Sequence, residues 1–174
     1  MPRGTEIAGK VMGKVKGARQ ALTGGSGVFE RLATEHGEIS TMIRRVSVSG
    51  HDSKVRAELF PRIRRELLAH ARAEEREVYS SFSTIPELAE HMTHSAEEHH
   101  EIERMLDELN LMPVTDDTWI TKLRELMKLV QRHVMDEELT VFPKAKKSIS
   151  RGQSEELEGR YLRAKEAELG TTVG

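Results

Sequence analysis

The feature that most constrains the fold is an internal repeat, in which the chain matches itself without a gap after a shift of 63 residues. One group of matches pairs Glu35 with Glu98, His36 with His99, Glu38 with Glu101, Ile39 with Ile102 and Met42 with Met105. A second group pairs His70 with His133, Glu74 with Glu137, Glu75 with Glu138 and Val78 with Val141. The two halves therefore look like two copies of one helix pair, and we expect an approximate two-fold axis.

Four long helical patterns begin at residue 28, and they cover 28–48, 52–82, 86–111 and 115–141. Their boundaries carry the usual signals, since Asp52 is a good N-cap and Pro86 suits a first turn. Long helices with short connections favour an up-down-up-down four-helix bundle. The sequence therefore predicts an all-α fold in which the repeat relates one helix pair to the other.

The segments on either side of the bundle differ from it in composition. Residues 1–27 contain seven of the 13 glycines in the chain, and this density disfavours a stable helix. We therefore expect a flexible glycine-rich arm over 1–27, the bundle over 28–150, and a short C-terminal helix with a tail over 151–174.

Each of the four helices carries one repeated histidine on its apolar stripe, where positions three or four apart share a face. These histidines are His36, His70, His99 and His133. Glu74 and Glu137 follow two of them by four residues and lie on the same stripes. Burying an unpaired carboxylate costs several kcal/mol unless something compensates the charge. Four imidazoles and two carboxylates inside one bundle therefore predict a metal site.

Buried histidines also have structural roles that need no metal. A single core histidine is more often hydrogen-bonded than metal-bound, and a His-x-x-x-Glu pair can be a local contact on one helix. Four such histidines in one register favour metal, and a structural bundle with buried His–Glu hydrogen bonds is the competing hypothesis. Glu75 and Glu138 lie beside the stripes and are expected to support the ligands. Tyr79 is expected to pack beside the apolar stripe of its helix, or to donate a proton.

Composition and charge exclude several classes of function. The chain has no cysteine, so disulfides, cysteine–zinc sites and thiol catalysis are excluded. The formal charge of −2 gives no field that would attract nucleic acid, and no apolar run approaches the ~20 residues that span a bilayer. The N-terminus makes a poor secretory signal, which favours the cytoplasm. No nucleophilic triad, phosphate-binding loop or HExxH motif is present. If the chain is an enzyme, its metal site must carry the chemistry, and the sequence leaves that question open.

The segments around the repeated residues are EHGEI at 35–39, HARAEE at 70–75, EEHHEI at 97–102 and HVMDEELTVFP at 133–143. Together they resemble the hemerythrin family, also called the HHE cation-binding domain, over about 28–150. The resemblance implies two iron ions bridged by two carboxylates and an oxo or hydroxo group. The ligands that it implies are His36 and His70 for one iron, His99 and His133 for the other, and Glu74 and Glu137 as bridges. Imidazole and carboxylate suit iron, although ligand type alone does not separate iron from zinc or manganese.

The chain departs from the oxygen-carrying hemerythrins on its third and fourth helices. Those proteins have two metal-binding histidines four residues apart on the third helix, whereas here the residue four positions after His99 is Glu103. Glu103 is therefore a candidate replacement ligand. Those proteins also use an aspartate five residues after the fourth-helix histidine, which makes Glu138 an alternative bridge. We favour Glu137 because it matches Glu74 in the repeat.

These observations favour a di-iron protein that binds, senses or reacts with O₂, peroxide or NO. Fewer histidines, or an added carboxylate, favour Fe(III) and reaction over reversible O₂ carriage. The alternative is an iron-sensing or iron-handling regulatory module without catalysis. The expected partner is a small diatomic molecule or peroxide, with no nucleic acid and no membrane, and the sequence leaves open a homodimer or an unknown protein partner.

Overall fold

The computed structural model describes residues 27–50 and 52–171 of the chain. The long helices are α2 (Val28–Ser47), α3 (Ser53–Ala73), α5 (Ala89–Leu111), α6 (Asp117–Asp136) and α8 (Arg151–Thr171). The shorter elements are the π-helical turn η1 (Glu74–Tyr79), α4 (Ser80–Phe82), the π-helical turn η2 (Glu137–Val141) and α7 (Phe142–Ser148). No β-strand occurs in these described ranges, which confirms the predicted all-α class.

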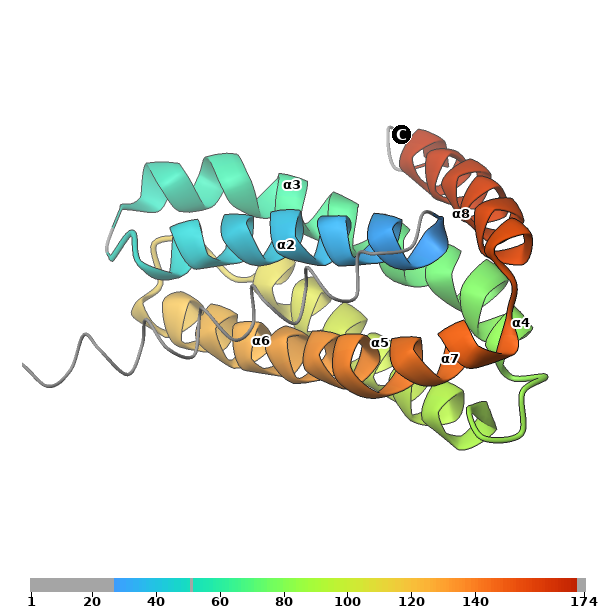
Figure 1. The fold of residues 1–174 in the computed structure, drawn as a ribbon. Helices are drawn as coiled ribbons and strands as arrows, with labels where there is room; N and C mark the ends of the chain where they lie inside the picture. The colour runs from blue at the N-terminus through green and yellow to red at the C-terminus, as the bar shows by residue number, and fades with distance from the viewer. Residues whose placement is uncertain (1–26, 51, 172–174) are drawn as a thin grey trace, which may run out of the picture.

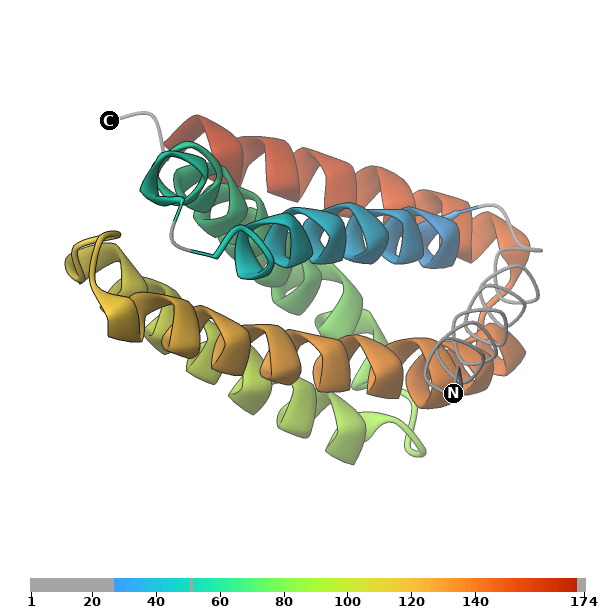
Figure 2. The same cartoon turned by 90° about the vertical axis from the view of Figure 1, so that its left-hand side faces the viewer.

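Helices α2, α3, α5 and α6 form a bundle (Figure 1). Helix α2 packs on α3 and α6, and α5 packs on α6 and α3, so the four helices close a ring. A perpendicular view shows α2 and α3 in one layer and α5 and α6 in the other (Figure 2). The predicted helical bundle is therefore confirmed.

Two helix boundaries that lie near prolines differ from the predicted ones. The helix expected from residue 86 begins at Ala89, since the residues after Phe82 form turns around Pro86. At the other end of the bundle, the chain stays helical beyond residue 141, where the predicted helix ends, and continues to Ser148. Pro143 lies in the first turn of α7, where a missing backbone N–H is tolerated.

Two apolar clusters fill the bundle, and the repeated histidines lie between them. The first cluster includes Ile39, Ile63, Ile102, Leu106, Trp119 and Leu123. The second includes Val28, Leu32, Val78, Phe82, Val141, Phe142 and Tyr161. On α2, for example, the buried His36 lies between Leu32 of the second cluster and Ile39 of the first. The bundle thus has a polar layer enclosed on both sides by apolar side chains.

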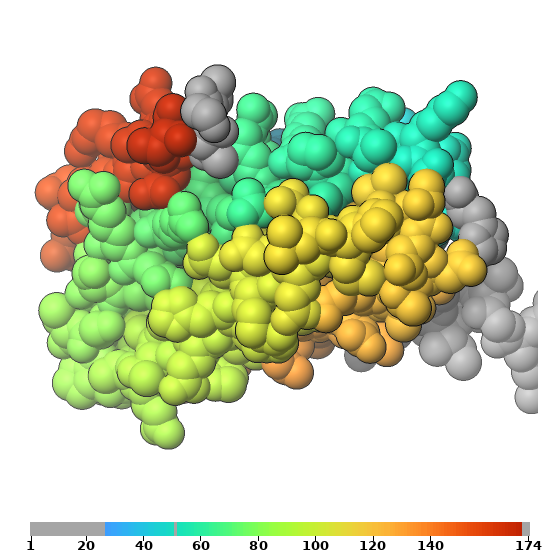
Figure 3. Space-filling model, turned by 180° about the vertical axis from the view of Figure 1, so that it is seen from behind, coloured from blue at the N-terminus to red at the C-terminus, as the bar shows by residue number. Residues whose placement is uncertain are grey.

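The C-terminal helix corrects the prediction of a short one. Helix α8 has 21 residues and packs on α3, α2 and η1 beside the bundle. The opposite face shows α3 and α5 covering the bundle, with α8 at one end (Figure 3). The start of α8 is fixed by Ser154, whose hydroxyl accepts a hydrogen bond from the Val28 N–H at 3.2 Å. Gly27 permits this approach, because it has φ of 106° and a Cβ there would lie 2.5 Å from Ser154 Oγ.

Most of the predicted flexible arm over 1–27 lies outside the described residues, so that part of the domain division stays a prediction. Within the described ranges, no helix combines the length and the apolar character needed to cross a membrane.

Candidate metal centre

Two groups of buried ligand-type side chains meet in the polar layer. One contains His36, His70 and Glu74, and the other contains Glu74, His99 and His133. Within each group the ligand atoms lie within 4.8 Å of one another. Glu74 Oε2 lies 3.2 Å from His70 Nε2 and 3.7 Å from His99 Nε2, so one carboxylate spans both groups. This arrangement fits two cations held side by side.

Glu137 links the two groups a second time. Its Oε2 lies 3.3 Å from His36 Nε2 and 3.5 Å from His133 Nε2. Glu137 and Glu74 therefore each lie between one histidine of the first group and one histidine of the second. Both carboxylates that the sequence placed on the apolar stripes lie in the cluster.

Several polar atoms of the cluster are buried without a hydrogen bond. Among the described residues, neither oxygen of Glu74 has a hydrogen-bond partner, and the same holds for Glu137 Oε2 and for the Nε2 atoms of His36 and His70. Glu74 is 0% exposed, so water does not solvate it. A buried carboxylate without donors is unfavourable. A cation between these side chains would satisfy all of these atoms together, so the residues fit a metal.

A glutamate holds the other ring nitrogen of each histidine. The pairs, joined by Nδ1–oxygen distances of 3.0–3.1 Å, are His36–Glu138, His70–Glu35, His99–Glu75 and His133–Glu98. A carboxylate at Nδ1 favours the tautomer with the proton on that nitrogen, which leaves the Nε2 lone pair facing the cluster. Glu75 and Glu138 therefore lie behind the histidines, as expected of supporting residues.

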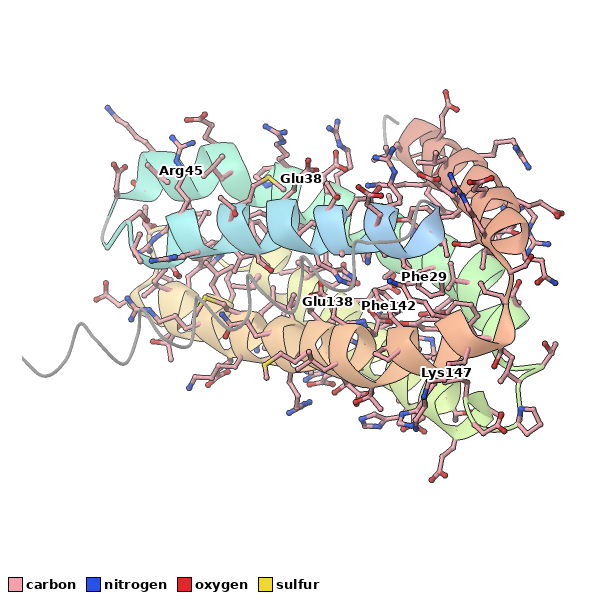
Figure 4. All side chains as sticks on the ribbon, in the orientation of Figure 1. Phe29, Glu38, Arg45, Glu138, Phe142 and Lys147 are labelled. Carbon is pink, nitrogen blue, oxygen red and sulfur yellow. The ribbon has the colours of Figure 1, made fainter. Side chains whose placement is uncertain are left out.

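The two carboxylates of the cluster each begin a π-helical turn. Turn η1 begins at Glu74 and η2 begins at Glu137. Such turns have i→i+5 hydrogen bonds and occur frequently at functional sites. In η2 the wider turn buries the consecutive Glu137 and Glu138 together, at 1% and 5% exposure. Figure 4 shows Glu138 with Phe142 between α2 and the α6–α7 segment.

The hydroxyl of Tyr79, at the end of η1, reaches the cluster. It donates a hydrogen bond to Glu137 Oε1 at 2.5 Å and lies 3.2 Å from His99 Nε2. The ring of Tyr79 stacks on that of His99, with 5.2 Å between centroids. Burial, together with the negative charges of Glu137 and Glu74, raises the pKa of Tyr79 well above its ordinary value. The phenol therefore keeps its proton and donates a hydrogen bond to Glu137.

The structure does not bring Glu103 into the cluster. Its carboxylate lies 2.5 Å from Arg72 Nη2, and its side chain is 37% exposed. The position that the sequence offered as a replacement for the fifth histidine therefore forms a surface ion pair. The hydroxyl of Tyr79, and not Glu103, lies beside His99 Nε2.

Helix α8 adds two residues that the sequence did not identify. The Tyr161 hydroxyl donates to Glu35 Oε2 at 2.6 Å and lies 2.8 Å from His70 Nδ1. Lys165 Nζ lies 2.7 Å from the same oxygen of Glu35. Because α8 lies outside the repeat, no matching position pointed to either residue. The available signal was the helical spacing of Leu157 and Tyr161, which indicates a buried face but no link to a site.

The pKa values of the histidines reflect an excess of negative charge in the cluster. Burial alone would lower the pKa of His36, but the carboxylates of Glu137 and Glu138 close to its two ring nitrogens raise it to about 10. The pKa values of His70 and His133 are also raised, because the carboxylates beside them outweigh burial. In the protein alone, histidine protons therefore balance the carboxylates, and a bound cation would displace them.

The histidines face a small apolar cavity on the side of the first cluster. It leaves about 10 Å³ for the centre of a water-sized sphere, which is room for about one small molecule. Its lining consists of the four histidines with Ile39, Leu67, Ile102, Val130 and Val134.

Fold and site together define a helical bundle with a candidate dimetal centre, and comparison with known proteins places it in a family. Residues 24–145 match the model of the Hemerythrin HHE cation binding domain, and the chain belongs to this family. The chain is also 24% identical, over 169 residues, to a protein of Nostoc sp. (strain PCC 7120) named "DNA nickase". That match covers 89% of this chain and 47% of the relative, so the chain spans about half of the relative's length. No solved structure gives a significant match.

Proposed function

We propose that this chain is a non-haem di-iron protein that binds, senses or reacts with O₂, peroxide or NO. The observation that carries the proposal is the buried Glu74 carboxylate, which has no hydrogen-bond partner among the described residues and belongs to both histidine groups. The proposed ligands are His36 and His70 for one iron, His99 and His133 for the other, and Glu74 and Glu137 as bridges.

We also propose that the centre has the approximate two-fold symmetry that the repeat predicts. The Nδ1 contacts of the four histidines support it, because they form two sets of pairs separated by the same 63 residues. The two π-helical turns begin at positions with this separation as well.

The size and polarity of the cavity support a small ligand. Its walls from Ile39, Leu67, Ile102 and Val130, with room for no more than about one water-sized molecule, favour a small uncharged ligand over a charged metabolite. Bound iron would supply open coordination positions and electrons for reducing such a ligand. The chain's own contribution is to hold the metal-binding side chains in place, exclude water, and keep a proton on the Tyr79 hydroxyl beside Glu137.

The proposal is tested by loading the full chain with Fe(II) under anaerobic conditions and adding O₂, NO or peroxide while recording the optical spectrum. A new absorption band that appears with about two irons per chain is the expected result. A stable, reversible band would indicate binding or sensing, and a band that decays with ligand consumption would indicate an enzyme. A chain that holds no iron after this loading would contradict the proposal.

An iron-sensing module is the second candidate, and the contact of α8 with the glutamate behind His70 favours it. In such a module, metal would stabilise the fold and a partner would detect the change. Chelation should then sharply increase proteolysis of the chain, and unchanged digestion would count against this candidate. The activity in the name of the Nostoc relative belongs to a protein about twice as long, and the proposal does not extend to it.

A further inference from the structure

Helix α8 supports one half of the candidate centre, which we call the α8-side position and define by His36 and His70. Behind His70, a single oxygen of Glu35 is contacted by His70 Nδ1 at 3.1 Å, the Tyr161 hydroxyl at 2.6 Å and Lys165 Nζ at 2.7 Å. Tyr161 is 0% exposed and the Lys165 side chain is 13% exposed. This carboxylate is therefore fixed from within the protein by two groups of α8.

The matching carboxylate of the other half is held from the surface. We call this half the far-side position and define it by His99 and His133. Behind His133, Glu98 lies 3.0 Å from Arg132 Nε and 3.6 Å from His94 Nε2. The side chains of Arg132 and His94 are 68% and 60% exposed. Water and salt weaken contacts of this kind, so Glu98 is held less firmly than its counterpart.

We propose that Tyr161 and Lys165 are positioning residues for the α8-side position, and that they make an ion there leave more slowly than an ion at the far-side position. This inference rests on the proposed function, because it requires two bound ions. The physical reason is that a fixed Glu35 holds the His70 ring with its Nε2 lone pair toward the metal. Groups hydrogen-bonded behind a ligand typically change metal affinity by about 10–100-fold.

The same contacts couple the metal to the docking of α8. If α8 strengthens binding at the α8-side position, bound metal must stabilise the docked helix by the same factor. Other contacts, such as that of Ser154 with Val28, keep α8 in place when metal is removed. Metal should therefore reduce the frequency with which α8 opens, without being required for its position.

The first test is release of iron from the full chain, loaded anaerobically with Fe(II), into excess chelator. Two phases of equal amplitude are expected, and His133→Ala, which removes a far-side ligand, should abolish the fast one. Tyr161→Phe keeps the ring and removes one donor, so it should accelerate the slow phase about 10-fold and leave the fast phase unchanged. Lys165→Met should act in the same direction, and Lys165→Arg should restore slow release. Arg132→Met is the matched far-side control and should leave the slow phase unchanged.

The second test needs no release of metal. Hydrogen exchange over residues 154–168 should slow when iron is bound to the wild type, and should slow less in Tyr161→Phe. A purely structural role for Tyr161 would change exchange equally with and without metal, and that result would overturn the inference. If Tyr161→Phe accelerated both release phases equally, the inference would be overturned while the proposed function stayed in place. The same holds if both ions left in a single phase, in the wild type and in the α8 variants alike. A wild type that binds no iron would overturn both.

Discussion

The α8-side and far-side positions have the same ligand types but different surroundings. Both have two histidines, both share Glu74, and each histidine has a glutamate at Nδ1. Behind them, one half has the buried Tyr161, and the other has the exposed Arg132. The repeat therefore matches the ligand-type side chains, while residues that it does not match, Tyr161 on α8 and Arg132 on α6, determine how firmly each half is held.

The largest effect is expected from a change that should not distinguish the two halves. Glu74→Gln removes the shared charge with little change in shape, so both positions should lose affinity. The loss should exceed about 100-fold, the upper range for residues that only support a ligand. Metal analysis after desalting should then find no retained iron. Glu75→Gln, one residue away and behind His99, is the comparison variant and should lose less, about 10–100-fold at the far-side position alone. Retention of two ions by Glu74→Gln would show that the carboxylate is not shared.

A smaller effect should separate the halves in the metal-free protein. Burial opposes ionisation of Glu35, but His70, Lys165 and Tyr161 lower its pKa to about 2. Glu35→Gln leaves the largely buried Lys165 without this partner, which should lower the free energy of unfolding by about 1–3 kcal/mol.

Glu98→Gln is the matched change on the far side. Its partner Arg132 is exposed and can turn to water, so the loss there should be smaller. Denaturant unfolding of the two variants at neutral pH measures the difference. Equal losses would contradict the distinction between the halves.

The pH dependence of the metal-free protein gives a further distinction. The folded-state pKa of His36 is about 10, against an ordinary value of 6.5. Its protonation therefore stabilises the folded state fully below pH 6.5, and this contribution is lost as pH rises through about 10. The melting temperature should fall over this interval, and metal affinity should rise because fewer protons are displaced.

The far-side His99 should behave in the opposite way, because burial lowers its pKa. NMR titration of the two imidazoles in the metal-free protein distinguishes them. His36 should remain protonated at neutral pH and His99 should be neutral. Two rings that titrate together near 6.5 would contradict this account of the charge balance.

The smallest effect is expected at Glu103. Because its ion pair with Arg72 is partly exposed, Glu103→Gln should change stability by less than about 0.5 kcal/mol. The variant should also bind the same amount of iron as the wild type. Metal analysis measures this directly, and a loss of one ion would restore Glu103 as a ligand of the far-side position.

Much of the centre could be predicted from helical periodicity. A regular helix places residues four apart on one face, so His70 with Glu74 and His133 with Glu137 had to point together. An apolar stripe also identifies which face is buried. Periodicity did not predict the departures from the regular helix, because it assumes one α-helical repeat throughout and so gave no sign of the π-helical turns η1 and η2.

The support from α8 could not be predicted, for a different reason. Tyr161 and Lys165 reach Glu35 only because α8 folds back onto α3 and α2, and no local pattern encodes such a long-range contact. A lysine and a tyrosine four residues apart on a largely polar helix otherwise indicate an ordinary surface. The prediction of a short helix was wrong at this point, since α8 has 21 residues and buries Ser154, Leu157, Tyr161 and Ala164 against the bundle.

The central claim is that the chain holds two metal ions at inequivalent positions. Calorimetric titration of the metal-free full chain with Fe(II) under anaerobic conditions tests it most directly. Two equivalents per chain should bind in two steps of unequal affinity, and in a Tyr161→Phe variant the two affinities should move closer together. Binding of a single equivalent, or no binding, would contradict it.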